Sequence, residues 1–402
     1  MSTQACGSCV GGKGASMATH DHEPAVGGGN VEPPGVRGYD SARDTRDIGE
    51  PGLVVEGLHK SFAGREVIKD VSLKVRAGEF VSLLGPSGCG KTTTLRMIAG
   101  FLHPDDGQVW MDSRDVTELG AERRPSAMVF QNYALWPHMT VERNVSFPLR
   151  VAKRPKEEIA RRVDAALELV NLTQQRKARP ARMSGGEQQR AALARALVRE
   201  PSILLLDEPL SNLDAKLRER VREDIRSIQQ RLHITTIMVT HDQQEAMAIS
   251  DRIAVMHDGR LEQVCGPDEL YAKPATENIA RFIGTMSEFD QAFRQRRVVK
   301  DEHWLVRPED IVYISADQPR DEDAACEDDQ LSPNHMPVIN ARVVRLIPHG
   351  RYGEVVFESD GGASLVGLHS NDASPVCAGQ YVRLSAKRVY HYVGNELSEV
   401  MQ

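Results

Sequence analysis

The sequence has few aromatic residues, no long apolar segment and no excess of positive charge. Aromatic residues make up 5% of its 402 residues, and the formal net charge is -7 at pH 7. Because a general nucleic-acid binder needs a basic surface, this acidic balance argues against that class. The longest apolar runs, such as residues 203–206, fall far short of the ~20 residues of a membrane-spanning helix. We therefore expect no membrane helix, and the first residues show no apolar segment typical of an export signal.

Cysteine is also sparse and shows no spacing typical of a disulfide framework. Without such a framework or an export signal, the six cysteines favour a reducing cytosol and free thiols. They are Cys6, Cys9, Cys89, Cys265, Cys326 and Cys377.

Residues 1–52 lack the side chains that build a core. Up to position 47 they contain no Leu, Ile, Phe or Trp, and they are rich in Gly, Pro and Asp. We therefore expect a disordered tail. Four residues in it are ligands of the kind that zinc accepts, namely Cys6, Cys9, His20 and His22. Since no second cysteine pair follows, a tail that binds no metal is the favoured interpretation.

One glycine-rich stretch matches the P-loop pattern G-x-x-x-x-G-K-[ST] at every constrained position. Its glycines let several N–H groups point inward, and the helix that follows adds the positive end of its dipole. Lys91 is expected to reach the β- and γ-phosphates of a nucleotide, and the Thr92 hydroxyl to bind Mg²⁺. The stretch is Gly85, Pro86, Ser87, Gly88, Cys89, Gly90, Lys91 and Thr92.

The flanking sequence supports this interpretation over a glycine-rich turn without a ligand. Residues 80–84 form a short apolar run typical of a buried strand, and residues 92–99 predict a helix that Gly100 ends. Before them, residues 53–58 and 71–75 alternate as half-buried antiparallel strands do. Phe62 lies between these two, where a flat ring could stack on a purine base, although a lone Phe more often belongs to a core.

A second half of the site follows further along the chain. Residues 203–206 form a run without polar alternation, typical of a strand buried on both faces, and this run ends in Asp207 and Glu208. Acidic residues at the carboxyl end of such a strand are placed to meet the metal at the P-loop. Another strand, residues 234–239, ends in Thr240 and His241.

Other segments are predicted from their periodicity. Helices are expected at residues 157–170, 187–199 and 217–232, with one more before residue 253. Strands are expected at residues 108–112, 127–130, 253–257 and 260–264, the last two joined by an Asp258-Gly259 hairpin. Residues 176–182 are expected to form a solvated basic loop, and residues 317–329 an acidic surface loop.

After about residue 284 the segments become short and β-like. They are separated by Gly, Asn, Asp and Pro, which predicts a small all-β, barrel-like domain. The expected strands are residues 304–306, 311–314, 338–347, 354–357 and 381–384.

One further motif, residues 183–190 (Met-Ser-Gly-Gly-Glu-Gln-Gln-Arg), completes a set of motifs in a definite order. With the P-loop, it makes residues 53–284 resemble the ATPase subunit of an ATP-binding cassette (ABC) transporter. The resemblance implies an α/β P-loop NTPase fold with antiparallel β and helical subdomains, the helical one at about residues 132–190. It also implies ATP and Mg²⁺ as ligands, with Thr92, Gln131 and Asp207 around the metal.

The same resemblance assigns roles to single residues. Glu208 becomes the general base or water-orienting group, His241 the switch histidine on the γ-phosphate, and Gln131 the Q-loop residue. It also favours Phe62 as the adenine-stacking aromatic and extends the nucleotide contacts to Thr93. For each residue alone a structural role, such as a helix cap or a core histidine, is a reasonable interpretation, but the joint order of the motifs outweighs it.

The signature residues are Ser184, Gly185, Gly186, Glu187 and Gln188. Such a serine–glycine turn at the start of a helix is a second phosphate-binding site, which in this family completes the ATP site of the opposite subunit. Ser211 and Asp214 resemble the family's D-loop. Because the chain has one P-loop and one signature, we expect a head-to-tail dimer, with itself or with a homologous ATPase subunit.

The subfamily is indicated by residues 131–140, 208–218 and 306–310. They resemble importers of sugars, polyamines, ferric iron and similar oxyanions, in which a TOBE-type, OB-like domain follows the ATPase domain; here it would be residues 285–402. The tail is short and diverged, which favours iron, polyamine or phosphonate over sugar. Trp136 and Met139 either lie near the groove that receives the permease or pack the helical subdomain; both remain open.

The resemblance thus predicts a peripheral ATPase at the cytoplasmic face of the cell membrane. Its expected partners are membrane permease subunits and, indirectly, a solute-binding protein, with no nucleic acid. Two other classes are weaker. An efflux ATPase usually lacks the C-terminal β domain, and soluble cassette proteins that act on nucleic acid or ribosomes tend to carry two cassettes or long insertions.

Overall fold

The computed structural model describes residues 51–290, 301–315, 336–370 and 376–402. The expected tail at 1–50, the possible zinc ligands Cys6, Cys9, His20 and His22, and the expected acidic loop at 317–329 lie outside these residues. The first strand begins at Pro51, two residues earlier than expected. None of the helices in the described part of the chain is long and apolar enough to cross a bilayer.

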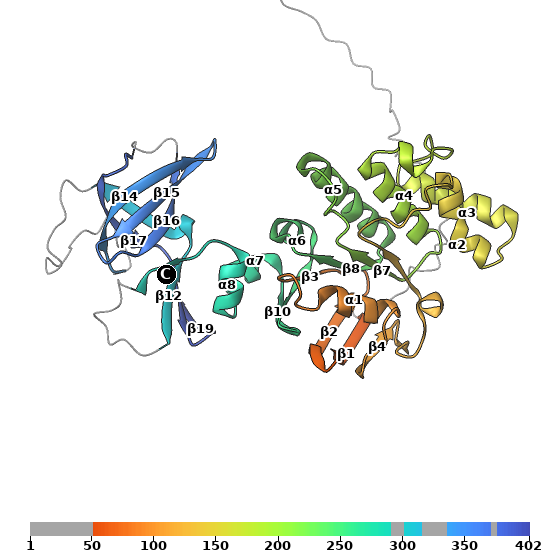
Figure 1. Cartoon of the computed structure of the whole chain (residues 1–402), viewed down its shortest axis with the longest axis horizontal. Helices are drawn as coiled ribbons and strands as arrows, with labels where there is room; N and C mark the ends of the chain where they lie inside the picture. Colours follow the sequence, from red (N-terminus) through yellow and green to blue (C-terminus); the bar gives the residue numbers. More distant parts are fainter. Residues whose placement is uncertain (1–50, 291–300, 316–335, 371–375) are drawn as a thin grey trace, which may run out of the picture. The chain divides into compact units, whose positions relative to one another are not determined.

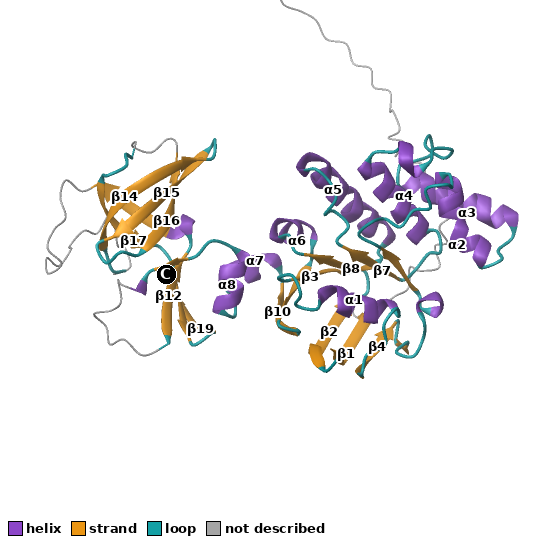
Figure 2. Ribbon diagram, viewed as in Figure 1, coloured by secondary structure: helices purple, strands orange, loops and turns teal. Residues whose placement is uncertain are grey.

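A six-stranded sheet lies at the centre of the N-terminal domain (residues 51–284), in the order β10-β9-β3-β8-β7-β6 (Figure 2). All neighbours are parallel except the β9–β10 hairpin. Every residue of β3, β7 and β8 is buried, which explains why these strands are mostly apolar, β7 without interruption from Ile203 to Leu206. The strands are β3 (Phe80–Leu84), β6 (Ser126–Val129), β7 (Ile203–Asp207), β8 (Thr235–Thr240), β9 (Arg252–His257) and β10 (Arg260–Cys265).

A second, antiparallel sheet has the order β2-β1-β4-β5, and helix α1 shares one hydrophobic core with both sheets (Figure 1). The helix begins at Lys91, one residue earlier than expected, and ends where Gly100 takes a left-handed conformation with φ 80. The elements are β1 (Pro51–Phe62), β2 (Arg65–Arg76), β4 (Asp106–Met111), β5 (Arg114–Asp115) and α1 (Lys91–Ala99).

Three helices form a helical segment, namely α2 (Val141–Val151), α3 (Lys156–Leu169) and α4 (Gly185–Leu197). Helices α3 and α4 were expected within two residues of these bounds. Helix α2 was not specifically expected, and its interior Pro148 is a residue that normally argues against a helix. Thr140 caps this helix, and the buried Asn144 side chain bonds to the loop before it.

On the other face of the central sheet, the core includes residues of α6, α7 and α8. Helices α5 and α6 fulfil expectations, whereas α7 and α8 are too short to give a clear periodic pattern. The helices are α5 (Ala215–Leu232), α6 (Gln243–Ile249), α7 (Pro267–Ala272) and α8 (Glu277–Ile283).

The C-terminal domain is all-β, as expected, and its described strands form two antiparallel sheets. Their orders are β11-β12-β18-β19 and β13-β17-β14-β15-β16. Four of these strands, β11, β16, β18 and β19, were not predicted. The strands are β11 (Ser287–Glu288), β12 (Glu302–Val306), β13 (Ile311–Ser315), β14 (Ile339–Pro348), β15 (Tyr352–Ser359), β16 (Ser364–Ser370), β17 (Tyr381–Ala386), β18 (Val389–Val393) and β19 (Glu396–Met401).

Helix α8 belongs to the cores of both domains. Ile279 and Ile283 pack in the core under the central sheet, whereas Ala280 packs with Tyr390 and Tyr392 of β18. The single helix therefore joins the two hydrophobic cores.

Candidate functional site

The glycine-rich stretch lies between β3 and α1, the strand–loop–helix context that the sequence predicts. The Lys91 side chain is buried and turns back along the loop. Its Nζ donates to the carbonyl oxygens of Gly85 at 2.7 Å and Pro86 at 2.9 Å. The loop thus surrounds one ammonium group at the N-terminus of a helix, where both the charge and the helix dipole attract anionic oxygens.

Two glycines in this loop are required by close packing. A Cβ at Gly85 would lie 2.1 Å from the carbonyl oxygen of Met256, and one at Gly90 would lie 2.4 Å from Cδ1 of Ile68. Gly90 also has φ 106, a conformation that residues with a side chain rarely adopt. The loop can therefore pass against β9 and β2 only because these positions carry no side chain.

An oxygen pair suited to a metal lies at the start of α1. The Thr92 hydroxyl donates to Oδ1 of Asp207 at 3.3 Å, which joins the P-loop to the end of β7. Burial raises the pKa of Asp207 above its usual value. A hydroxyl and a carboxylate are ligands that Mg²⁺ accepts when phosphates and water fill its remaining positions. The donor set thus fits the expected ion.

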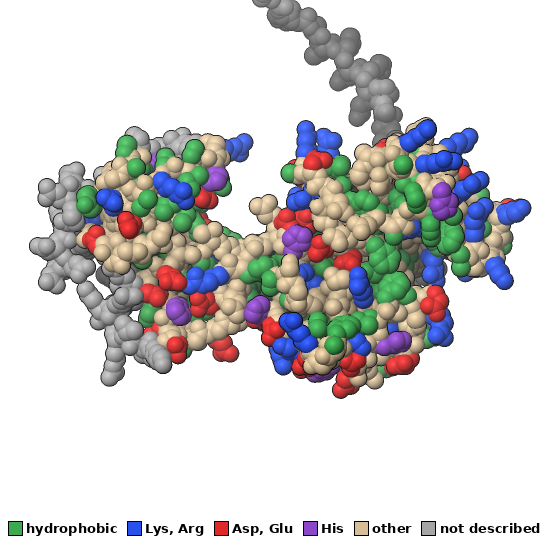
Figure 3. All heavy atoms as spheres, viewed as in Figure 1, with side chains coloured by type: hydrophobic (Ala, Val, Ile, Leu, Met, Phe, Trp, Pro, Cys, Tyr) green, Lys and Arg blue, Asp and Glu red, His purple; other side chains and the backbone are tan. Residues whose placement is uncertain are grey.

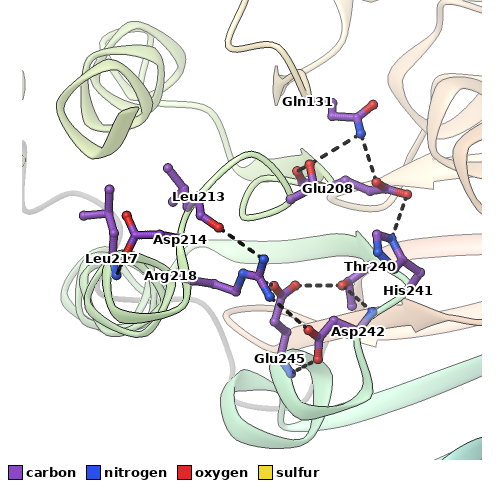
Figure 4. A network of polar contacts seen from close by, with 11 residues as sticks. Gln131, Glu208, Leu213, Asp214, Leu217, Arg218, Thr240, His241, Asp242 and Glu245 are labelled. Atoms are coloured by element: carbon purple, nitrogen blue, oxygen red, sulfur yellow. Dashed lines mark hydrogen bonds and ion pairs between the residues drawn. The ribbon is translucent and has the colours of Figure 1, made fainter. Parts of the chain in front are cut away.

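Glu208, the next residue, has an unusual backbone conformation with φ 44, which is uncommon for a residue with a long side chain. Its N–H still bonds to the carbonyl of Val239, so the strained residue directly continues the sheet. Such strain is found at functional sites, where it aims a side chain. Here it directs the carboxylate away from the sheet and toward two of the expected catalytic residues (Figure 4).

The Glu208 carboxylate lies between Gln131 and His241. Nε2 of Gln131 donates to Oε2 at 3.0 Å, and Nδ1 of His241 lies 3.4 Å from Oε1. Gln131 is positioned in turn by Asn212, whose amide donates to its backbone carbonyl at 2.9 Å, and by Ser211 at 3.4 Å. The structure therefore brings together the three expected catalytic residues, although within the described residues Gln131 makes no hydrogen bond to Thr92 or Asp207.

Comparisons with known proteins agree with this geometry. A family model described as ABC transporter matches residues 68–211. The spermidine/putrescine import ATP-binding protein PotA of Oleidesulfovibrio alaskensis is 51% identical over 243 residues, 60% of this chain and 65% of that protein. PotA of Vibrio parahaemolyticus is 50% identical over 251 residues, 62% of this chain and 67% of that protein. The chain belongs to the ABC transporter family.

A solved ABC protein gives the same assignment from the fold. The structure of cbiO1 from Clostridium perfringens, part of the ABC transporter complex cbiONQ, matches with a TM-score of 0.53 and 31% identity. The match covers 56% of this chain and 92% of that one. The chain spans about two thirds of the length of the PotA relatives, 65% in the first two.

In the ABC fold the signature residues begin α4. The Ser184 hydroxyl accepts from the Glu187 N–H, and the Glu187 carboxylate accepts from the Ser184 N–H at 2.9 Å, a reciprocal capping box. Hydrogen bonds from Ser184 lower the pKa of Glu187. Glu187 thus stabilises the start of the helix.

The two signature glycines pack against the segment after β7 and the first turn of α5. A Cβ at Gly185 would lie 3.0 Å from a methyl group of Leu213, and one at Gly186 would lie 2.9 Å from a methyl group of Leu217. Within the described residues, no hydrogen bond or ion pair joins residues 184–188 to the P-loop. The role of the signature on a second subunit's nucleotide stays a prediction.

The remaining predicted residues lie in two places. Asp214 caps α5, accepting from the N–H of Leu217 at 3.0 Å. Phe62 lies at the turn of the β1–β2 hairpin, is 46% exposed, and has Lys60 Nζ 5.9 Å from its ring centroid. An exposed ring is free to stack on a base, but within the described residues Phe62 makes no ring contact with the P-loop.

Sequence analysis missed three charged residues near this site, namely Arg195, Arg218 and Glu245. Arg195 donates to the carbonyls of Ala134 and Tyr133 at 2.6 and 2.8 Å. These two residues follow Gln131 and both have left-handed backbones. A signal was available only for Glu245, because Asp242-x-x-Glu245 is a helix-capping pattern. Arg195 lies on the signature helix α4 and Arg218 is the last residue of the 208–218 motif, but neither motif indicates a contact for its arginine, so only the fold reveals these contacts.

Ala134 and Trp136 also border a cavity of about 450 Å³ in the same domain. Trp136 lines the cavity and packs on Phe147 with ring centroids 4.2 Å apart, so it both packs the helices and faces the cavity. Met139 does not line it. In the space-filling view, hydrophobic side chains are visible between α4 and β4 (Figure 3).

Proposed function

We propose that this chain is the ATP-hydrolysing subunit of an ABC importer. It acts at the cytoplasmic face of the membrane and drives solute uptake through a separate permease. The observation that supports this most strongly is the Glu208 carboxylate held between Gln131 and His241, one residue after Asp207. A P-loop alone indicates nucleotide binding; a carboxylate aimed out of the sheet by a strained backbone indicates hydrolysis.

In this proposal the chain supplies placement and charge rather than a covalent intermediate. Lys91 binds the β- and γ-phosphates, and the Thr92–Asp207 pair holds Mg²⁺, which neutralises charge on the phosphates when bound. Glu208 orients a water molecule and accepts its proton as the water oxygen attacks the γ-phosphorus. The bond to the β-phosphate oxygen then breaks and leaves ADP. His241 contacts the γ-phosphate beside Glu208.

Two copies of the chain form each complete site in this proposal. The exposed Ser184 and the start of α4 offer N–H groups and a helix dipole to a phosphate. In the described residues, Ser184 and the start of α4 make no hydrogen bond or ion pair with the P-loop of their own chain. Residues 184–188 of one subunit therefore face the P-loop of the other.

The permease contact is proposed at the cavity of about 450 Å³, which is lined by aromatic and basic side chains. Phe101 is 56% exposed, and the Arg195 guanidinium lies 5.0 Å from the Trp136 ring centroid. Exposed aromatic residues in a hollow are typical of an interface anchor.

The transported solute is proposed to be a polyamine, because the PotA relatives are named for spermidine and putrescine import.

Glu208→Gln tests the assignment of the base. The amide can still form hydrogen bonds but cannot take a proton, so turnover should fall by about 10²- to 10⁴-fold while ATP binding persists. With MgATP the variant should accumulate as a dimer on size exclusion. Glu219→Gln, an exposed residue of α5, is the matched control and should hydrolyse as the wild type does. Hydrolysis by Glu208→Gln at the wild-type rate refutes the assignment.

Mixed dimers test the composite site. Ser184→Arg and Lys91→Ala should each be inactive alone, and a mixture should regain part of the activity because one site is then built from intact halves. No recovery in any mixture counts against the dimer.

An uptake assay tests the transport role. Vesicles that hold this chain and its co-purified permease should accumulate labelled spermidine in the presence of ATP. Export instead of uptake would favour an efflux ATPase.

A further inference from the structure

A network of polar contacts centres on Arg218, near the start of α5 (Figure 4). Its NH2 group donates to the carbonyl of Leu213 at 3.2 Å, in the segment that follows Glu208. Its NH1 group donates to Oδ2 of Asp242 at 3.4 Å, the residue after His241. One guanidinium thus joins the loop after β7 to the loop after β8.

The third partner of Arg218 is a buried carboxylate. Glu245 is 4% exposed, and its Oε1 lies 3.4 Å from Nε of Arg218. Its Oε2 accepts from the Thr240 hydroxyl at 2.8 Å. The Thr240 hydroxyl accepts in turn from the N–H of Asp242 at 3.0 Å. Both neighbours of His241 in the chain are therefore fixed by contacts that meet at Arg218 and Glu245.

His241 itself has little that holds it in place. Its side chain is 57% exposed, and its polar contact within the described residues is the one to Glu208, at 3.4 Å. Its position therefore depends on the backbone of Thr240 and Asp242. A ring on an exposed loop needs such support to stay near a reacting group, because a misplacement of about 1 Å can cost 10²-fold in rate.

We propose that Arg218 is a positioning residue for hydrolysis. It holds His241 against Glu208 by tying the Leu213–Asp214 segment to the residues on either side of His241. This inference rests on the proposed ATPase function and deepens it.

The chemistry of the side chain explains why arginine serves here. A guanidinium is planar and presents donors in fixed directions, so it can meet a carbonyl and two carboxylates at once. A lysine carries one point charge and cannot reach all three in the same geometry. Arg218→Lys should therefore keep the charge beside the buried Glu245 but hold the two loops less firmly.

Arg218→Gln is the principal test, measured by ATP hydrolysis of the full chain. The value of kcat should fall about 10- to 100-fold while KM for ATP changes little, because the nucleotide contacts are untouched. Arg218→Lys should recover part of the loss. Arg226→Gln is the matched control, since Arg226 also lies on α5 and pairs with Asp251 at 3.1 Å, away from His241. It should leave kcat unchanged. A wild-type kcat in Arg218→Gln overturns the proposal.

Combination with His241→Ala separates positioning from general support of the fold. If Arg218 acts through His241, Arg218→Gln should lower kcat in the wild-type background but hardly at all in His241→Ala. An equal loss in both backgrounds would mean that Arg218 acts on the fold at large, and would overturn the assignment.

A readout without hydrolysis keeps this inference separate from the proposed function. The imidazole NMR signals of His241, assigned by their loss in His241→Ala, should shift in Arg218→Gln and stay in place in Arg226→Gln. Unchanged signals in Arg218→Gln overturn the inference even if the protein is an ATPase. Conversely, a wild-type chain that hydrolyses no ATP refutes the proposed function, and the shift of these signals still decides whether Arg218 positions His241.

Discussion

The central parallel sheet and the C-terminal β domain bury their strands in different ways. Every residue of β7 is buried, so its sequence is an apolar run that ends abruptly in acidic residues. In β15, buried and more exposed residues alternate, because one face packs on the core and the other faces outward. Glu208 and His241, the proposed catalytic residues, lie where β7 and β8 end, whereas the β domain has no such row of parallel strand ends in the described residues.

This difference shows where in the molecule a catalytic site can form. Parallel strands present their carboxyl ends at one edge, so residues distant in sequence, such as Thr92, Asp207 and His241, meet there. Antiparallel strands alternate in direction and give no common edge. A change in the β domain should therefore affect folding, whereas a change at the edge of the parallel sheet should affect ligand binding and turnover.

The largest effect on stability is expected in the β domain, from Phe357→Ala. This ring is fully buried, with its centroid 5.0 Å from that of Tyr313. Its removal should cost about 3–5 kcal/mol, visible by calorimetry as a lowered transition of the β domain. Val393→Ala, on the exposed side of β18, is the control. ATP hydrolysis by the folded variant should be retained, and a parallel loss of hydrolysis would break the distinction between the two regions.

Gly85→Ala should have the next largest effect, this time on binding. The new Cβ would meet a backbone carbonyl that cannot move aside, so ATP affinity should fall at least 100-fold, about 2.7 kcal/mol, as measured by calorimetric titration. Gly350→Ala, at a left-handed turn in open space in the β domain, is the control for backbone strain alone and should bind ATP normally. Normal binding by Gly85→Ala would show that the loop has more room than its contacts indicate.

The joint between the regions is tested by Gly284→Ala. Its Cβ would lie 2.6 Å from NH1 of Arg307, a guanidinium that is 1% exposed and 3.7 Å from the Tyr271 ring centroid. Because the φ of Gly284 is extended, the effect is steric only. The free energy of unfolding should therefore fall by about 1–3 kcal/mol. Adding Arg307→Met should restore part of this loss. Gly266→Ala, whose nearest new contact is 3.9 Å away, should be neutral.

The smallest effect expected is a pH dependence at the edge of the parallel sheet. Burial raises the pKa of Asp207, so the folded state binds its proton more tightly than the unfolded chain does. The ionised group therefore opposes folding above its folded pKa, and this penalty is lost as pH falls through that value. Without nucleotide and Mg²⁺, Asp207→Asn should be more stable than the wild type at pH 8. Urea unfolding should show the difference shrinking toward pH 4; a constant difference would contradict the assignment.

Sequence patterns predicted the N-terminal domain more completely than the β domain. The bounds of β3 were predicted to the residue and those of β7 to within one, because a strand buried on both faces leaves an unbroken apolar run. Strand β19 escaped prediction because its residues Glu396–Met401 lie at the surface with little alternation in burial. Helix α2 escaped because Pro148 lies inside it, where the cap at Thr140 and the buried Asn144 outweigh the proline.

The residues of the candidate site also differ in how well the sequence predicted them. Its motif residues were predicted because each stands in a pattern with a chemical reason, such as Lys91 after two glycines. Arg195 and Arg218 lie beside motifs that give them no chemical role of their own, since an arginine on a helix is an ordinary surface residue until the fold brings it to a carbonyl or a carboxylate. Their partners, Ala134 and Leu213, are in other elements.

The sequence alone determined that this chain has a nucleotide loop, an acidic strand end and a signature helix, because those features depend on local order along the chain. Only the tertiary structure decided that Glu208 lies between Gln131 and His241 and that one arginine ties the two loops around them. Such contacts join residues far apart in sequence, and their distances are set by the spacing of parallel strands in a buried sheet.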